Sequence, residues 1–64
     1  MEFMKIQDKN TRQVIRWFID KSEVTQSTFE NKKEELMGQG KRYNTSYTLR
    51  DGKTDDFIHV HHLN

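Results

Sequence analysis

The chain has 64 residues, of which 31% are hydrophobic and 33% charged, and it contains neither cysteine nor proline. A chain of this length forms a single domain, residues 1–64, and buries only about 60% of the surface that its unfolded state exposes. Disulfides are excluded, so a metal, a partner or self-association remain as sources of added stability. The net charge is +1, from 11 basic and 10 acidic residues. Overall charge therefore cannot drive tight binding to a polyanion, which would need local segregation of charge.

The first six residues do not resemble a signal peptide, because Glu2 and Lys5 interrupt what would have to be a continuous apolar run. No segment has the length of apolar sequence needed to cross a membrane. The absence of cysteine also fits a reducing compartment. We therefore expect a cytoplasmic protein without membrane contact.

The N-terminal part of the chain predicts two paired strands. Residues 3–7 form the first, and a turn through 8–10 leads to the second, Arg12 to Ile19. This second segment is ambiguous, because its apolar residues also recur at helical spacing. It is short and rich in β-branched and aromatic residues, which favours a strand. A helix over 12–19 is the alternative, and the polar stretch from Asp20 to Gln26 is the one linker-like segment.

The clearest helix begins after Val24. Thr25 is a candidate N-cap, and Val24 and Phe29 occupy the positions of a hydrophobic staple. The helix is expected to end at Gly38 or Gly40, since glycine readily takes the left-handed conformation that closes a helix. Its apolar stripe consists of Phe29, Leu36 and Met37.

The last third of the chain, Arg42 to Leu63, predicts a β-hairpin. Two alternating runs flank Asp51-Gly52, a dipeptide that suits the two positive-φ positions of a type I′ turn. A two-residue turn there would place Arg50 opposite Lys53 and Tyr47 opposite Asp56.

Together these elements predict an α+β fold, a small antiparallel sheet with one helix packed on one face, in the order ββαββ. The helical reading of 12–19 gives two helices followed by a C-terminal β-hairpin. Successive strand residues point to opposite faces, and we expect the helix to cover the face that carries Met4, Ile6, Ile15, Trp17, Ile19, Tyr43, Tyr47, Leu49, Ile58 and Val60.

The opposite face is then expected to be open, with phenylalanines among basic residues, and an exposed apolar patch normally marks an interaction site. It would carry Phe3, Lys5, Arg12, Val14, Arg16, Phe18, Arg42, Arg50, Phe57, His59 and His61. The residues predicted to contact a partner are Arg12, Arg16, Phe18, Arg42, Phe57, His59 and His61. The candidate occupants are a second copy in a homodimer, another protein, or single-stranded nucleic acid whose bases stack on the rings.

Metal binding and catalysis are not expected. His59 and His61 alternate on one strand face, but they supply only two ligands, and a third would have to come from His62, from an acidic residue such as Asp55 or Asp56, or from a partner chain. There is no glycine-rich phosphate loop and no nucleophile with a base at a recognisable spacing. A nuclease built on Asp55, Asp56 and His59 is the least implausible enzyme, and we predict neither a cofactor nor a small-molecule substrate.

We therefore predict a small non-enzymatic regulator or inhibitor that binds a protein, with single-stranded nucleic acid or DNA binding as the alternative. The small size and the missing catalytic residues are similar to those of accessory regulators encoded by bacteriophages and mobile elements. Many of those act by masking a surface of a host protein, which favours a protein partner.

Overall fold

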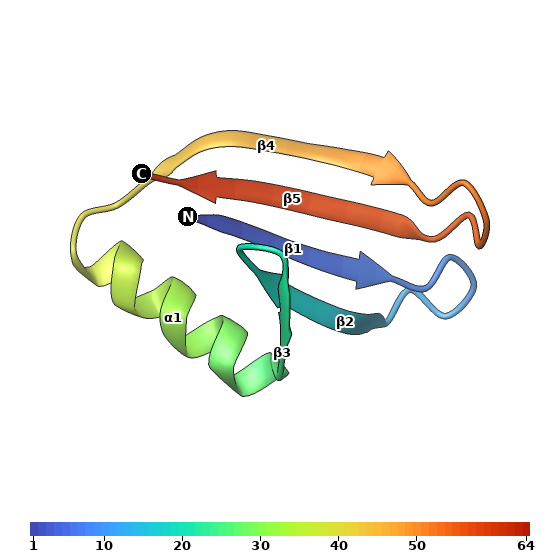
Figure 1. Ribbon diagram of the computed structural model, residues 1–64, viewed down its shortest axis with the longest axis horizontal. Coiled ribbons are helices and arrows are strands. Elements are labelled where there is room, and N and C mark those ends of the chain that lie inside the picture. Colours follow the sequence, from blue (N-terminus) through green and yellow to red (C-terminus); the bar gives the residue numbers. More distant parts are fainter.

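The computed structural model describes residues 1–64 as one helix and a five-stranded antiparallel sheet (Figure 1). The predicted α+β class is confirmed, and residues 12–19 contain a strand. The observed order is βββαββ, because the expected linker contains a third strand. In chain order the elements are β1 (Glu2–Gln7), β2 (Val14–Ile19), β3 (Ser22–Val24), α1 (Gln26–Gly38), β4 (Tyr43–Arg50) and β5 (Phe57–Leu63). The helix is neither long nor apolar enough to span a membrane.

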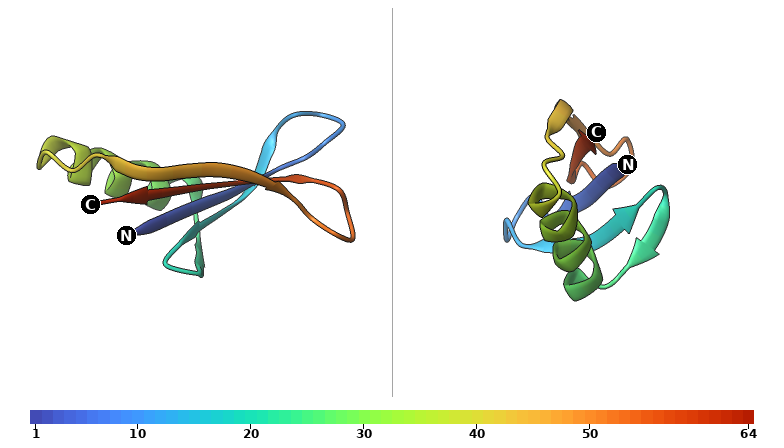
Figure 2. Two further views of the ribbon diagram at one scale, coloured as in Figure 1. Left: turned by 90° about the horizontal axis from the view of Figure 1, so that it is seen from above. Right: turned by 90° about the vertical axis from the view of Figure 1, so that its left-hand side faces the viewer.

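The strands lie in the order β3-β2-β1-β5-β4, so the two chain ends meet on the central strands β1 and β5. The helix covers one end of one side of the sheet, and the turn between β2 and β3 projects from the other side (Figure 2). We call the side that packs against α1 the back face. The side toward the viewer in Figure 1 is the front face.

The core is small and lies between α1 and the back face. Phe3 and Phe29 are fully buried and Leu63 is nearly so, whereas Val60, the fourth buried residue, lies on the front face. Phe3, Phe29 and Leu63 form one cluster, whose partly buried neighbours are Trp17, Ile19, Val24 and Leu36. The free energy of folding must therefore come from few side chains, as expected of a chain this short.

The structure corrects which side of β1 the helix covers. Phe3, predicted to be open, is in the core, whereas Met4 and Ile6, predicted to lie under the helix, are on the front face. Residues opposite one another in a sheet share a face, and Phe3 is opposite Ile19 while Met4 is opposite Phe18. A bulge between Ile6 and Gln7 shifts the register, and a shift of one residue exchanges the two faces of a strand.

The β4–β5 turn is longer than predicted. Tyr47 lies opposite Val60, four positions beyond the predicted Asp56, because the loop runs from Asp51 to Asp56. A shift by an even number of residues keeps each side chain on its face. Tyr47, Leu49, Ile58 and Val60 therefore share a face as expected, but it is the front face, and the helix does not cover it. Tyr43 instead joins the back face, because a second bulge lies between it and Thr45.

The loops 8–13 and 51–56 have the same construction, which explains the longer turn. Asp8 Oδ1 accepts hydrogen bonds from the amides of residues 10 and 11, and Asp51 Oδ1 accepts them from residues 53 and 54. A residue with positive φ follows in both, Arg12 at 66° and Asp55 at 67°. The shared sequence is Asp-x-x-Thr, in which the aspartate side chain organises its own turn.

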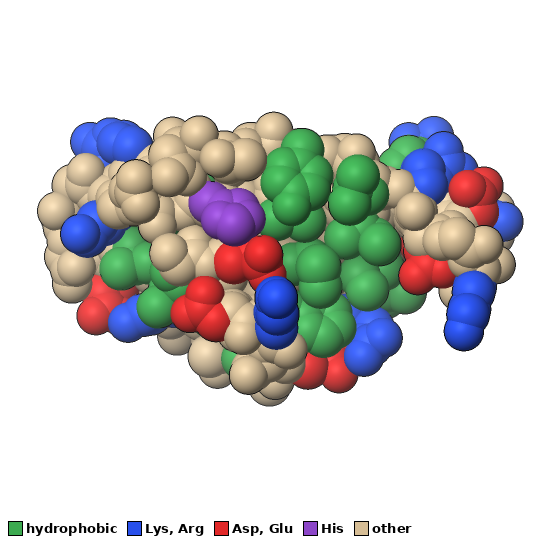
Figure 3. Space-filling model, turned by 45° about the horizontal axis from the view of Figure 1, so that its top comes forward, with side chains coloured by type: hydrophobic (Ala, Val, Ile, Leu, Met, Phe, Trp, Pro, Cys, Tyr) green, Lys and Arg blue, Asp and Glu red, His purple; other side chains and the backbone are tan.

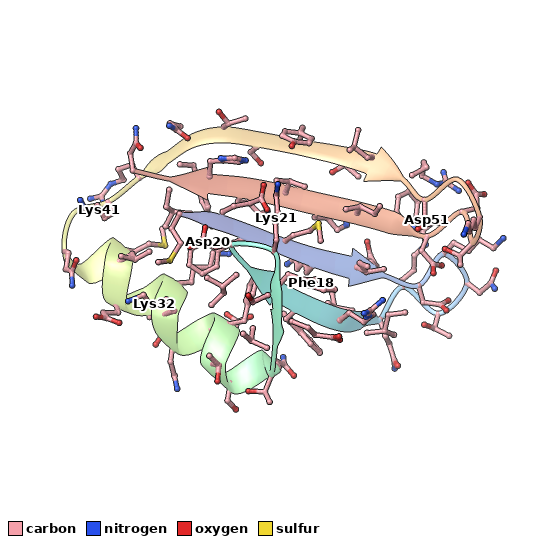
Figure 4. The ribbon with its side chains drawn as sticks, viewed as in Figure 1. Phe18, Asp20, Lys21, Lys32, Lys41 and Asp51 are labelled. Atoms are coloured by element: carbon pink, nitrogen blue, oxygen red, sulfur yellow. The ribbon has the colours of Figure 1, made fainter.

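The tight turn with two positive-φ residues lies elsewhere, between β2 and β3. Asp20 and Lys21 have φ values of 48° and 69°, and Ile19 is opposite Ser22, which is the arrangement predicted for Asp51-Gly52. Figure 4 shows Asp20 and Lys21 at this turn, in front of the sheet. The Asp20 carboxylate accepts a hydrogen bond from the amide of Glu2 at 2.9 Å, which fixes the turn to the start of β1.

Both ends of α1 are capped. The Thr25 side chain accepts a hydrogen bond from the amide of Thr28, so the predicted N-cap is confirmed. At the other end the amide of Lys41 donates to the carbonyl of Leu36, and the amide of Gly40 donates to that of Met37. This pair of bonds is the Schellman motif, and Gly40 has the positive φ of 87° that it requires.

Candidate functional site

The residues predicted to form one binding face lie on both faces of the sheet. Phe18 is on the front face opposite Met4, and Arg16 is opposite Ile6 on the same side. Phe57, His59 and His61 alternate along β5 on the back face, with Arg12 close to Phe57. Arg42 belongs to neither group, because its guanidinium donates to the carbonyl of Lys41 and weakly to that of Met37 at the end of α1. The single aromatic and basic face expected from the sequence is therefore wrong as a unit.

The part of the back face beyond the helix carries an aromatic and cationic cluster. The rings of Phe57 and His59 are stacked, with centroids 6.2 Å apart and planes 20° from parallel. The guanidinium groups of Arg50 and Arg12 lie 4.4 and 5.5 Å from the centre of the Phe57 ring. Each is within the range of a cation–π contact. Arg50 is also paired with Asp55 at 2.7 Å, whereas Arg12 has no carboxylate partner.

A continuous chain of hydrogen bonds crosses this face. Gln7 Nε2 donates to the Arg12 carbonyl at 2.8 Å, so Gln7 Oε1 is the acceptor that faces His59 Nε2, also at 2.8 Å. The other ring nitrogen of His59, Nδ1, lies 3.0 Å from Thr48 Oγ1. A neutral His59 thus carries its proton on Nε2 and accepts from Thr48. His61 repeats half of this pattern, with Nδ1 2.9 Å from Ser46 Oγ.

The electrostatic environment of these histidines is positive. Partial burial lowers the pKa of His59 below its ordinary value, and the charge of Lys5 lowers it further. Burial also lowers the pKa of His61, followed by the charges of Lys33, Lys5 and His59. The back-face positions of the strands include neither Asp nor Glu. A shallow hollow of about 300 Å³ opens here, lined by Lys5, Gln7, Val14, His59 and His61.

The acidic residues considered for a metal-dependent site are occupied elsewhere. Asp55 forms the ion pair with Arg50, and Asp56 Oδ1 accepts a hydrogen bond from the amide of Lys9. The latter bond joins the two similar loops. No group of three or more His, Cys, Asp or Glu side chains is placed to hold a metal ion.

The front face is chemically different, because its centre is apolar and no helix covers it. We call its exposed and half-buried members the front patch: Met4, Ile6, Phe18, Tyr47, Leu49 and Ile58. Figure 3 shows hydrophobic side chains gathered on this side of the molecule, beside a histidine and acidic residues. Leu49 and Tyr47, at the outer edge, are 53% and 42% exposed.

The charges around the front patch are largely paired. Arg16 makes a bidentate contact with Glu23, at 2.9 and 3.0 Å, and its guanidinium lies 5.0 Å from the centre of the Phe18 ring. His62 lies 3.5 Å from Glu2. The pairing raises the pKa of Arg16 and lowers that of Glu23, mainly through the hydrogen bonds between the two side chains. The front patch therefore has an apolar centre and a nearly neutral polar rim.

Sequence reasoning missed several of these residues. Met4, Ile6, Tyr47 and Leu49 were assigned to the helix-covered face, although they form most of the front patch. Gln7 and Thr48, which hold His59, were not singled out at all. The available signal was the alternation of side chains along each strand, which divides one strand between two faces. The faces of neighbouring strands can be matched only when the loop lengths and the bulges are known.

Comparison of the chain with protein-family models, curated proteins and solved structures finds no match. No family therefore supplies a function for this arrangement. The two faces must be interpreted from their own geometry and chemistry.

Proposed function

We propose that this chain is a small, non-enzymatic regulator or inhibitor that acts by binding a protein on the front patch. The observation that carries the proposal is a sheet face with six exposed or half-buried apolar side chains that no helix covers. Contiguous apolar surface on a small domain normally marks an interaction site. The occupant we infer is an apolar surface on another protein.

The rim of the front patch favours a protein over a polyanion. Arg16 is neutralised by Glu23, Glu2 lies beside His62, and Lys21, in front of the sheet, directly follows Asp20 in the chain, so positive charge does not dominate the rim. An apolar centre inside a polar rim is the usual composition of a protein interface. Phe18 is the anchor we infer, because aromatic side chains at the centre of an interface carry much of the binding energy.

We infer a non-enzymatic regulator because the chain is expected to lack a catalytic site. It is too small for a concave site that excludes water around a set of catalytic groups. The absence of cysteine suits a reducing cytoplasm. Masking a partner's surface, as accessory regulators of phages and mobile elements do, requires only one exposed face.

The back face favours a second candidate function, the binding of single-stranded nucleic acid. Phe57 offers a ring for base stacking, and Lys5, Arg12 and Lys33 take part in no ion pair. Unpaired cations beside an aromatic ring are the means by which single strands are held without sequence readout. The two candidate functions therefore use opposite faces and different residues.

A pull-down from a lysate of the source organism, with and without nuclease, separates the two. We expect a stoichiometric protein partner that survives nuclease treatment and is lost with Phe18→Gln. A hot-spot side chain is worth about 2 kcal/mol or more, so the Kd should rise at least about thirtyfold. Met37→Gln is the matched control, because Met37 is 39% exposed but lies on α1, away from the front patch.

Binding of single-stranded nucleic acid on the back face would give a different and equally specific result. Material that disappears with nuclease, and binding that weakens with Lys5→Gln and with rising salt but not with Phe18→Gln, would replace the first candidate by the second.

A further inference from the structure

The outer edge of β4 is an open row of backbone hydrogen-bonding groups. The amide of Asp51 donates to the Asp56 carbonyl, and Arg42 and Asn64 exchange backbone hydrogen bonds at the other end of the pair. Groups along a strand alternate between its two neighbours. The N–H and C=O groups of Ser46, Thr48 and Arg50 must then point away from β5, where the sheet has no further strand.

The two edges of this sheet are not alike. The β3 edge is three residues long and carries Glu23, which forms an ion pair with Arg16. Short, charged edges resist pairing. The β4 edge has eight residues, all exposed, and no proline, lysine or acidic residue. Its single bulge, between Tyr43 and Thr45, lies at its start. Apart from Arg50 at its end, the rest of its length has none of the features that keep an edge unpaired.

We propose that β4 pairs antiparallel with β4 of a second copy, joining two five-stranded sheets across a two-fold axis. The axis is perpendicular to the sheet and passes beside Tyr47. This symmetry keeps both helices on the back, and it places the two front patches side by side. The inference concerns the edge and is independent of what binds the front patch.

Charge and the length of the overlap between the two β4 strands determine which residues lie opposite one another. With Tyr47 opposite its own copy, Arg50 lies opposite Asn44 and Thr45 lies opposite Leu49. Centring the pair on Ser46 would instead place Arg50 opposite Arg42, and like charges directly opposite are destabilising. Centring it on Thr48 would leave Thr45 opposite Asp51, beyond the end of the strand. The Tyr47 register therefore gives the longest overlap without a like-charge pair.

Two features favour a second copy of the chain as the partner of the β4 edge: the low charge of the strand and the small core of the domain. Arg50 is the only charged residue of β4, so two copies of the strand meet without repulsion. Only four residues of the chain are buried, and self-association is a common means of stabilising such small domains. The two-fold also brings the exposed rings of Tyr47 together, and cross-strand aromatic pairs are stabilising.

Sedimentation equilibrium of the whole chain between micromolar and millimolar concentration tests the dimer, and amide exchange at both ends of that range locates it. We expect a mass of twice 7.8 kDa at high concentration. The amides of Ser46, Thr48 and Arg50 should exchange at least tenfold more slowly in the dimer. A chain that stays monomeric at 1 mM overturns the proposal, and so does a dimer in which these three amides exchange as in the monomer.

Charge variants test the register. Tyr47→Lys and Tyr47→Glu should each weaken self-association at least tenfold, and an equimolar mixture of the two should restore it. Ser22→Lys on the β3 edge is the matched control and should leave the dimer unchanged. Should a Tyr47 variant fail to fold, Thr48→Pro replaces it, because the Thr48 amide donates to no neighbour within the monomer. Dimers that persist in all of these variants, or a mixture that stays monomeric, overturn the Tyr47-centred pair.

Discussion

The ring of Phe3, on β1, meets the ring of Phe29, on α1, edge to face, with centroids 5.3 Å apart and planes at 88°. These are the two large side chains that the fold buries completely. They join the helix to the sheet at the centre of the core, together with Trp17 and Ile19 of β2, so the position of α1 depends on them. Edge-to-face pairs add about 0.5–1.5 kcal/mol to the stabilisation that burial alone provides.

We therefore predict that Phe29→Ala lowers the free energy of unfolding by about 3–5 kcal/mol, the usual effect of deleting a buried aromatic ring. Met37→Ala, on the same helix but exposed, should change it by less than about 0.5 kcal/mol. Urea denaturation followed by far-ultraviolet circular dichroism measures both. A Phe29→Ala chain as stable as the Met37→Ala chain would contradict this account of the core.

The aspartates of the two similar loops should make the fold sensitive to acid. Backbone hydrogen bonds, from Thr11 to Asp8 and from Thr54 to Asp51 first, lower the pKa of each carboxyl below its ordinary value of 3.8. A lowered pKa in the folded state means that this stability is present above about pH 3.8 and is lost as the pH falls through the folded pKa. We expect Tm to fall below pH 4. Asp51→Asn should flatten that fall, and an equally steep fall in the variant would contradict the role of the loop.

Four of the five strands, the helix and its caps were accessible from sequence because their signals are local, whereas the three-residue strand β3 was interpreted as a linker. Thr25 before an apolar stripe, or β-branched runs broken by polar turns, can be interpreted without knowing the rest of the chain. The choice of face could not be made in this way. Phe3 and Met4 are both apolar neighbours, and only the bulge after Ile6 and the packing of Phe29 decide which of them is buried.

The candidate site depended on the same choice. Phe57, His59 and His61 were correctly placed together, since alternate residues of one strand must share a face. Phe18 was wrongly grouped with them, because the sequence reasoning matched strands β1 and β2 one residue out of register. The prediction of a two-residue turn between β4 and β5 was also wrong. Asp51-Gly52 fits a type I′ turn, but Thr54 completes a longer Asp-x-x-Thr loop.

The histidines of the back face should add a second dependence on pH. Burial lowers the pKa of both rings below the ordinary value of 6.5, and the charge of Lys5 at His59 and the charges of Lys33, Lys5 and His59 at His61 lower it further. The unfolded chain then binds more protons, so stability is full above about pH 6.5 and declines as the pH falls through 6.5 toward the folded pKa values. Tm measured between pH 8 and pH 5 should fall accordingly.

Variants of the back-face residues show which groups cause the decline in Tm. His59→Gln and His61→Gln should each reduce the change in Tm between pH 8 and pH 5, and the double variant should reduce it most. Lys5→Gln tests the cause, because it removes a charge that lowers the pKa of both rings while leaving both histidines in place. It should also reduce the decline. An unchanged profile in all of these chains would assign the decline to other groups.

The two glycines at the end of α1 should respond to the same substitution in opposite directions. Gly38 is the last helical residue, and a Cβ there would meet no atom within 4 Å. Gly38→Ala should therefore raise the free energy of unfolding by about 0.5–1 kcal/mol, because alanine loses less backbone entropy in a helix. Gly40 also has free space around it, but its φ is 87°. Gly40→Ala should cost about 1 kcal/mol through backbone strain alone. Urea denaturation of the pair measures both signs, and equal effects would show that the Schellman motif does not hold this helix end.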